Sequence, residues 1–144
     1  MPNILVLSLV YLPDNVSTAH IITNLCEDLR KFGYKVTVVT SMPHYHPDPN
    51  MNPYNYKQRH FGNLIYKYDI RGIRIFRIFM PPKSNKMVSR VFSWLWFNIM
   101  SLLIGMFLTL KEKPDIIFTP SPPLTNGIVA WLLSLLNGAK YIYN

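Results

Sequence analysis

The sequence is poor in cysteine and in acidic residues. Its 144 residues include one cysteine and seven acids against fifteen lysines and arginines, which gives a net charge of +8. A single cysteine excludes a disulfide framework and any metal site built from several cysteines. Because 49% of the residues are hydrophobic, a buried core is expected and intrinsic disorder is not. The length fits one domain and is too short for two.

Short apolar runs alternate with helical periodicity along the chain. Ile4–Val10 and Val36–Thr40 are rich in aliphatic residues, which is typical of strands covered on both faces. Between them, apolar residues recur at steps of three and four, which predicts a helix that Ser17 or Thr18 caps and Gly33 ends. Further strands are predicted at 64–68, 73–79, 115–119 and 139–143, and further helices at 88–110 and 124–136.

This order of elements predicts one α/β domain over residues 1–144, with a Rossmann-like, mostly parallel sheet and helices on both faces. The segments 64–68 and 73–79 alternate apolar and polar residues around Gly72. We therefore expect them to form a hairpin or an edge pair with one face in water.

The excess of positive charge is concentrated in one segment. Residues 57–90 contain nine basic residues and one acid, whereas the rest of the chain contains six of each. The next twenty residues, 91–110, carry no charge and include two tryptophans. A basic segment beside an aromatic helix favours docking on an anionic membrane surface; the alternative is a core helix beside a solvated cationic strand. The residues expected to contact the membrane or a lipid diphosphate are Arg71, Arg74, Arg77, Lys83, Lys86, Arg90, Trp94 and Trp96.

Two other uses of this segment have less support. Twenty uncharged residues can span a bilayer, but a spanning helix would separate the strands at 73–79 and 115–119, which one sheet must hold together. Nucleic acid is not expected as a partner, because the sequence contains no known binding module and no Arg-rich recognition helix.

The loop after the first strand is a candidate ligand site, because open α/β sheets bind ligands beyond the carboxyl ends of their strands. It contains Asn15, Val16, Ser17 and Thr18 but no glycine, which a phosphate-cradling loop would need. These residues either contact a ligand or simply cap the following helix.

Two later loops are candidates for the same reason. His44 and Tyr45, followed by His46, form either a sugar contact or a loop with solvent-facing imidazoles. The two histidines lack a third ligand, so no metal is predicted. Ser121 lies in a proline-rich turn that lacks the Gly-x-Ser-x-Gly setting of a hydrolase nucleophile, and a proline is expected at the first position of the helix that follows.

Several of these segments form a familiar series. Ile4–Ser8, Tyr11–Asp14 and Leu25–Thr40 are followed by Pro43-His44-Tyr45, and then by Lys113–Ile117 with Ser121-Pro122-Pro123. Together they resemble the N-terminal domain of family 4 glycosyltransferases with the GT-B fold, of the type that builds bacterial capsules and exopolysaccharides. The chain has Gly33-Tyr34 where that family usually has Gly-His.

The resemblance implies the acceptor-binding, membrane-docking half of a retaining glycosyltransferase. Such an enzyme moves a sugar from a nucleotide sugar to a polyprenyl-diphosphate-linked saccharide, in the cytoplasm and peripherally on the inner face of the cytoplasmic membrane. The acceptor-binding residues implied are Asn15, Val16, Ser17, Thr18, His44, Tyr45 and Ser121.

The resemblance also implies a limit. The donor sugar would bind a C-terminal domain that this sequence does not contain, so no cofactor and no catalytic residue are assigned here. We expect a fragment, a split subunit or the product of a truncated gene, inactive in isolation. The alternative is a non-catalytic, membrane-anchoring subunit that recruits a separate donor-binding subunit.

Overall fold

The computed structural model describes residues 1–144 except 45–49, 51–57, 61–63 and 82–85. The strands are β1 (Asn3–Leu7), β2 (Lys35–Ser41), β3 (Gln58–His60), β4 (Ile65–Ile70), β5 (Ile73–Ile78), β6 (Ile116–Thr119) and β7 (Lys140–Tyr143). The helices are α1 (Ser17–Lys31), α2 (Met87–Glu112) and α3 (Thr125–Asn137). Each predicted strand and helix has a counterpart, and β3 is an additional strand that the sequence did not indicate.

The strands form one sheet in the order β3-β4-β5-β2-β1-β6-β7. β1 pairs in parallel with both β2 and β6, and further parallel pairs join β2 to β5 and β6 to β7. β4 is antiparallel to β5, and β3 is antiparallel to β4. The expectation of a mostly parallel sheet is confirmed.

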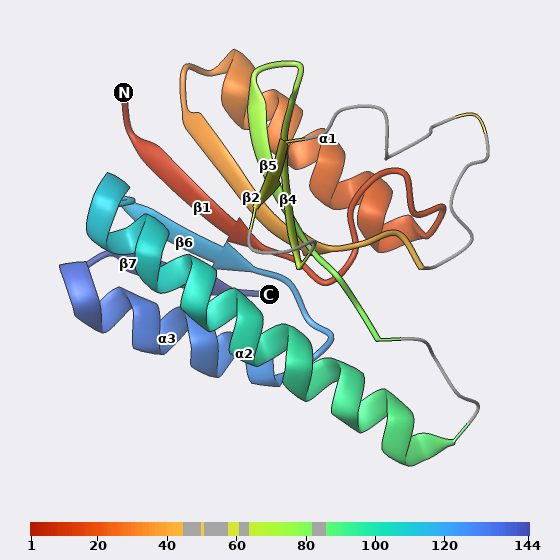
Figure 1. Ribbon diagram of the computed structural model, residues 1–144. Helices are drawn as coiled ribbons and strands as arrows, with labels where there is room; N and C mark the ends of the chain where they lie inside the picture. The colour runs from red at the N-terminus through yellow and green to blue at the C-terminus, as the bar shows by residue number, and fades with distance from the viewer. Residues whose placement is uncertain (45–49, 51–57, 61–63, 82–85) are drawn as a thin grey trace.

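Helices cover both faces of this sheet, with α1 on one face and α2 and α3 on the other (Figure 1). Ile22 and Cys26 of α1 pack with the buried Val36 and Val38 of β2. On the opposite face, Phe97 and Ile104 of α2 and Leu133 of α3 belong to a second buried cluster that includes Leu5 and Leu7 of β1. The two cores give β1 and β2 their continuous apolar sequence, since a central parallel strand is buried on both sides.

The predicted hairpin forms, but its predicted wet face does not. β4 and β5 pair antiparallel, and Gly72 occupies the turn with a φ of +76°, which glycine adopts easily. β5 then lies between β4 and β2, inside the sheet. Ile75 and Ile78 are fully buried because α1 packs on one face of β5 and α2 on the other.

The helix boundaries also differ in detail from the sequence prediction. Val16, not Ser17 or Thr18, is the N-cap of α1, and no side chain forms a capping hydrogen bond there. Gly33 follows α1 with a φ of +88°, which confirms it as the stop. α3 begins at Thr125, so the prolines of the preceding turn end before the helix instead of occupying its first position.

The two helices on the second face are held firmly to each other and to the sheet. The Asn98 amide nitrogen donates to Thr125 Oγ1 at 2.8 Å, which links α2 to the start of α3. A Cβ atom at Gly105 would lie 2.4 Å from Leu133 Cδ1, so any larger residue there would force the buried Leu133 side chain to shift. At its carboxyl end α2 is fixed by Glu112, whose carboxylate accepts hydrogen bonds from Arg74.

Candidate functional site

The carboxyl ends of β1, β2, β5 and β6 meet at one edge of the sheet, because these strands are parallel neighbours. We call this the carboxyl edge. The segment from β1 to α1, the segment after β2 and the turn from β6 to α3 all leave the sheet there. The first turns of α2 lie at the same end of the molecule, since α2 follows β5 (Figure 1). The strand order reverses between β1 and β6, with β2 on one side of β1 and β6 on the other, and open α/β sheets bind their ligands at such a point.

Asp14 joins the first two loops of the carboxyl edge. Its carboxylate is fully buried, and Oδ1 accepts a hydrogen bond of 2.9 Å from the backbone N–H of His44. The His44 ring is oriented by Nδ1, which lies 2.8 Å from the carbonyl oxygen of Met42 and 3.0 Å from Ser41 Oγ. A carbonyl oxygen can only accept, so Nδ1 carries the proton and Nε2 is the basic nitrogen of the neutral ring. The structure thus brings His44 to the loop that contains Asn15.

Arg77 is the second link between these loops, and its predicted role as a membrane contact is wrong. The side chain is fully buried (0% exposed) below the carboxyl edge. Its guanidinium donates to the carbonyl oxygens of Leu12 and Ser41 and to the hydroxyl of Tyr68. Because β5 lies inside the sheet, a side chain that looked solvent-facing from sequence alternation points into the layer beneath α1.

The tyrosine beside Arg77 shares this buried environment. Burial raises the pKa of Tyr68 above its usual value, and the positive charge of Arg77 counteracts only part of that shift. The Tyr68 hydroxyl therefore stays protonated at neutral pH and accepts the hydrogen bond from Arg77 as a neutral group. Arg77 is fully buried and Tyr68 is 7% exposed, so we assign both to holding the loops and not to contacting a ligand.

The remaining residues of the first loop lie at the surface. Asn15 is exposed, and its Oδ1 lies 2.9 Å from Nε2 of His20, one turn into α1. Ser17 is exposed, and Val16 and Thr18 are half-buried. Since no side chain forms a capping hydrogen bond to α1, the hydroxyls of Ser17 and Thr18 are not used in capping the start of this helix.

Ser121 lies on the other side of β1 from His44. It is half-buried in the turn after β6, where its backbone N–H donates to the carbonyl oxygen of Asn144. Among the described residues, no hydrogen bond links Ser121 to His44 or to Asn15. Tyr45 and His46 lie outside the described residues.

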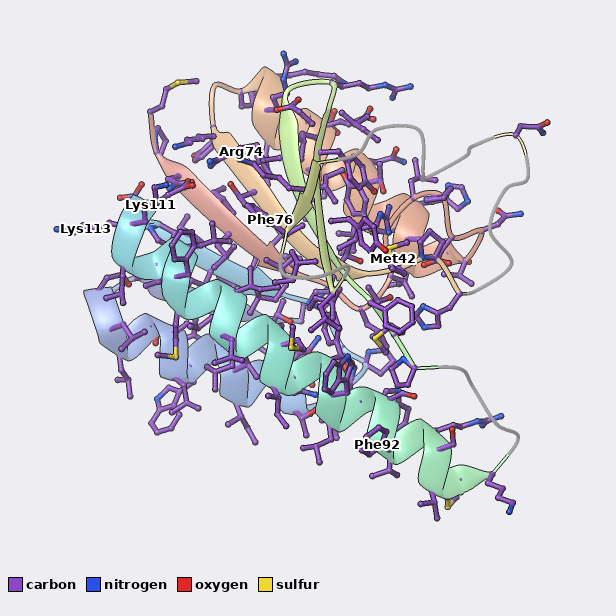
Figure 2. The ribbon with its side chains drawn as sticks, in the orientation of Figure 1. Met42, Arg74, Phe76, Phe92, Lys111 and Lys113 are labelled. Atoms are coloured by element: carbon purple, nitrogen blue, oxygen red, sulfur yellow. The ribbon has the colours of Figure 1, made fainter. Side chains whose placement is uncertain are left out.

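The basic segment does not form one surface, which corrects the sequence prediction. Arg71 pairs with Glu27 at 2.6 Å, and Arg74 bonds to Glu112 and to Thr37 Oγ1. Both lie at the amino end of β5, away from the carboxyl edge. Figure 2 shows Arg74 at the same end of the molecule as Lys111 and Lys113, the end opposite to the first turns of α2.

Only part of the predicted basic surface remains at the start of α2. Lys86 and Arg90 are exposed there, at the same end of the molecule as the carboxyl edge, whereas Lys83 lies outside the described residues. Trp94 is exposed on α2, and Trp96 is half-buried with its indole N–H donating to the carbonyl oxygen of Phe79 at 2.9 Å. This hydrogen bond of Trp96 links α2 to the residue that follows β5.

The structure adds residues that the sequence analysis did not select. In the sequence, Asp14 stands out only as the end of the segment Tyr11–Asp14, Tyr68 only as a residue of a predicted strand, and Ser41 lies just after the predicted strand Val36–Thr40. A buried aspartate between a proline and a polar loop carries no local periodicity, and its contact with His44 follows from the pairing of β1 with β2, which places the two following loops together. Within the described residue ranges, no three His, Cys, Asp or Glu side chains are grouped closely enough to hold a metal ion.

Comparisons with known proteins place the fold. No family model matches the sequence, and no curated protein matches it. The structure is a Rossmann-like α/β domain similar to part of sucrose-phosphate synthase from Thermosynechococcus elongatus, a GT-B glycosyltransferase, with a TM-score of 0.60 at 14% identity. That match covers 99% of this chain and 32% of the synthase, so the chain spans about a third of its length.

A second solved structure has the same fold. The C-terminal domain of a hydrogenase from Pyrococcus furiosus matches with a TM-score of 0.59 at 11% identity, over 99% of this chain and 90% of that domain. Since a glycosyltransferase and a hydrogenase domain match almost equally well, these similarities establish the α/β fold, and function must be inferred from the site.

Proposed function

We propose that this chain is the acceptor-binding, membrane-docking half of a retaining glycosyltransferase, which moves a sugar from a nucleotide sugar to a polyprenyl-diphosphate-linked saccharide. The observation that carries the proposal is the presence of two features at the same end of the molecule. Buried Asp14 and Arg77 hold the first two loops of the carboxyl edge together, and exposed Lys86 and Arg90 lie at the start of α2, which extends from that end (Figure 1). A polar loop surface at the same end as exposed cations suits a saccharide attached to a diphosphate.

The residues divide between the two parts of such an acceptor. The side chains proposed to contact the saccharide are Asn15, Val16, Ser17, Thr18, His44 and Ser121, and Tyr45 stays a prediction outside the described residues. Lys86 and Arg90 would hold the diphosphate, with Lys83 again a prediction. Donor binding and the transfer step are assigned to a separate domain or subunit, so we propose no catalytic residue in this chain.

A titration without a membrane tests this function. The probe is N-acetylglucosamine linked through diphosphate to a short geranyl chain, kept below its critical micelle concentration. We expect it to shift the backbone amide signals of residues 14–18, 41–44 and 119–126 in NMR spectra of the labelled chain. His44→Ala should weaken binding by about tenfold or more, as expected for loss of a hydrogen-bonding group.

The control is Asn24→Ala, which removes an exposed polar side chain from the middle of α1. It should bind the probe as the native chain does. Shifts scattered over the whole sheet, or equal affinity in the His44 and Asn24 variants, would contradict the proposed site.

A second function has a specific observation in its favour. β7 is an edge strand, and all four of its residues are exposed, although parallel strands are usually covered on both faces. A groove of about 630 Å³ beside it is lined by residues that include Trp131, Leu135 and Ile142. An uncovered apolar edge favours pairing with another polypeptide.

That observation suits a non-catalytic, membrane-anchoring subunit that recruits a donor-binding glycosyltransferase subunit. Purification of the chain from its native source tests it. A co-purifying donor-binding subunit that Ile142→Lys releases would support this second function. If the protein in that source is a single chain that also carries donor-binding residues, the second function is excluded and the first is supported.

A further inference from the structure

The outward-facing sides of α2 and α3 form an apolar surface that no other helix or strand of the described residues covers. α2 presents Leu95, Ile99 and Leu103, and α3 presents Ile128, Trp131 and Leu135, all exposed. Figure 2 shows the side chains of both helices projecting away from the sheet, with Phe92 toward the amino end of α2 and Lys111 toward its carboxyl end. We call this surface the outer helix face.

The spacing of residues explains why α2 has two apolar sides. Leu95, Ile99 and Leu103 are four residues apart and lie on the outer side, whereas Phe97, Ile104 and Leu108 are buried against the domain. The inner side accounts for the packing of α2 on the sheet and on α3. The outer side is equally apolar and has no partner among the described residues.

The outer helix face has a cationic rim and no free acid within it. Residues 91–110 and 124–139 carry no charge, and Lys86 and Arg90 precede α2's uncharged stretch while Lys111 and Lys113 follow it. Lys111 Nζ lies 5.5 Å from the centroid of the Phe107 ring, so its stem runs along the apolar surface while its charge stays at the border.

Of the two acids at the carboxyl end of α2, Glu112 is paired with cations and Asp115 is bonded to the backbone. Glu112 bonds to Arg74 and lies 3.3 Å from Lys35 Nζ. Asp115 accepts a hydrogen bond of 2.7 Å from the backbone N–H of Asn3. Asp115 is exposed and keeps its negative charge, but the four cations of the rim outweigh it, so the net charge around the helices is positive and complementary to anionic lipid headgroups.

We infer that the outer helix face lies in the headgroup region of an anionic bilayer, with the axes of α2 and α3 along the membrane plane. The inference rests on the proposed membrane docking and specifies its surface: two helices with Lys86, Arg90, Lys111 and Lys113 at the rim, and not the arginines of β5. A lipid diphosphate at headgroup depth then lies level with the start of α2, at the carboxyl edge.

An in-plane helix fits the fold better than a spanning one. α2 is the one helix in the described part of the chain that is long and apolar enough to cross a membrane, and 44% of its most apolar stretch is buried in the domain. β5 and β6, which precede and follow α2, belong to the same sheet. A spanning α2 would have to pull apart the sheet that these two strands share.

Vesicle sedimentation with matched variants tests the surface. The vesicles contain phosphatidylcholine alone or equal parts phosphatidylcholine and phosphatidylglycerol. Leu103 and Ile128 are 56% and 57% exposed on the outer helix face, and Ile21 is 64% exposed on α1, on the opposite side of the sheet. The Leu103→Asp, Ile128→Asp double variant should lose binding by about tenfold or more, whereas Ile21→Asp should bind like the native chain.

The cationic rim is tested on the same vesicles. Replacing both Lys86 and Arg90 by alanine should weaken binding to the anionic vesicles by about thirtyfold, and high salt should have a similar effect. Equal binding to both kinds of vesicle, unchanged by salt, would overturn the electrostatic part of the inference.

Trp131 tests whether α3 enters the headgroup region together with α2. In a chain with Trp94→Phe and Trp96→Phe, Trp131 is the remaining tryptophan of three. Brominated phosphatidylcholine in the anionic vesicles should quench its fluorescence. Vesicle binding without quenching would overturn the two-helix surface.

Sedimentation equilibrium without lipid tests whether a second copy of the chain, and not a membrane, covers the outer helix face. A dimer that the Leu103→Asp, Ile128→Asp variant dissociates would show that a second copy covers the face, and would overturn the inference. Because the saccharide probe is titrated without a bilayer, failure of vesicle binding and failure of the proposed acceptor site are separate results.

Discussion

The buried guanidinium of Arg77 makes the sharpest prediction about stability. It donates to the carbonyl oxygens of Leu12 and Ser41 and to the Tyr68 hydroxyl, and it has no exposed surface. Arg77→Met fills most of the volume but removes the donor from the carbonyl oxygen of Ser41, in a buried hydrogen bond, and from that of Leu12, in a part-buried one, at about 1–3 kcal/mol each. With the loss of the Tyr68 hydrogen bond, we expect the free energy of unfolding to fall by about 3–5 kcal/mol.

Urea unfolding at neutral pH, followed by far-UV circular dichroism, measures this loss. Arg71→Met is the control, because the Arg71 side chain is 71% exposed and its pair with Glu27 is screened by water, so the change should be below about 1 kcal/mol. Tyr68→Phe removes one hydrogen bond and should cost about 1 kcal/mol, which keeps the prediction measurable if Arg77→Met does not fold. An Arg77→Met variant within about 1 kcal/mol of the native chain would refute the buried network.

Three further predictions concern the helices. Gly105→Ala should lower the free energy of unfolding by about 1 kcal/mol in urea titrations, because crowding against Leu133 outweighs the gain in helix propensity. Hydrogen bonds from Arg74 lower the pKa of Glu112, so Glu112 stabilises the fold above about pH 4.5 and loses this effect as the pH falls through its lowered pKa. The stability difference between native and Glu112→Gln chains, measured by thermal unfolding against pH, should shrink accordingly. Burial raises the pKa of Cys26 to about 12, so the folded chain should not react with Ellman's reagent at pH 8 until urea unfolds it.

Each of these has a result that would count against it. Gly127→Ala is the control for Gly105, because its Cβ would meet Tyr143, which is exposed and can move; equal losses in both variants would contradict the helix contact. A Glu112→Gln effect that grows below about pH 4.5 would have the wrong sign for a carboxylate with a lowered pKa. Rapid labelling of Cys26 in the folded chain would mean that α1 opens easily from the sheet.

The fold was largely predictable because its signals are local. The apolar runs of β1 and β2 and the periodicity of α1, with Gly33 as its stop, identify elements without tertiary information. The place of β5 in the sheet was not predictable, since alternation looks the same in an edge strand and in an interior strand that buries an arginine. That one difference moved Arg77 from the expected surface to the core.

The loops of the candidate site were predictable from the sequence, but the buried hydrogen bonds that hold these loops together were not. His44 and Asn15 follow strands, so the sequence places them at the carboxyl edge. The hydrogen bond from the His44 backbone N–H to the Asp14 carboxylate depends on the packing of two loops thirty residues apart, which no local pattern encodes. The basic segment was wrongly predicted to form one surface for the same reason. Arg71 pairs with Glu27 and Arg74 with Glu112, and only the folded chain brings these partners together.

Calorimetric titration of the chain with two classes of ligand tests the proposed division of labour most directly. The acceptor probe, geranyl-diphosphate-linked N-acetylglucosamine, should bind, whereas the nucleotide sugars UDP-glucose and GDP-mannose should neither bind nor be turned over. Binding or turnover of a nucleotide sugar by residues 1–144 alone, with no binding of the acceptor probe, would contradict the assignment of this chain as the acceptor half.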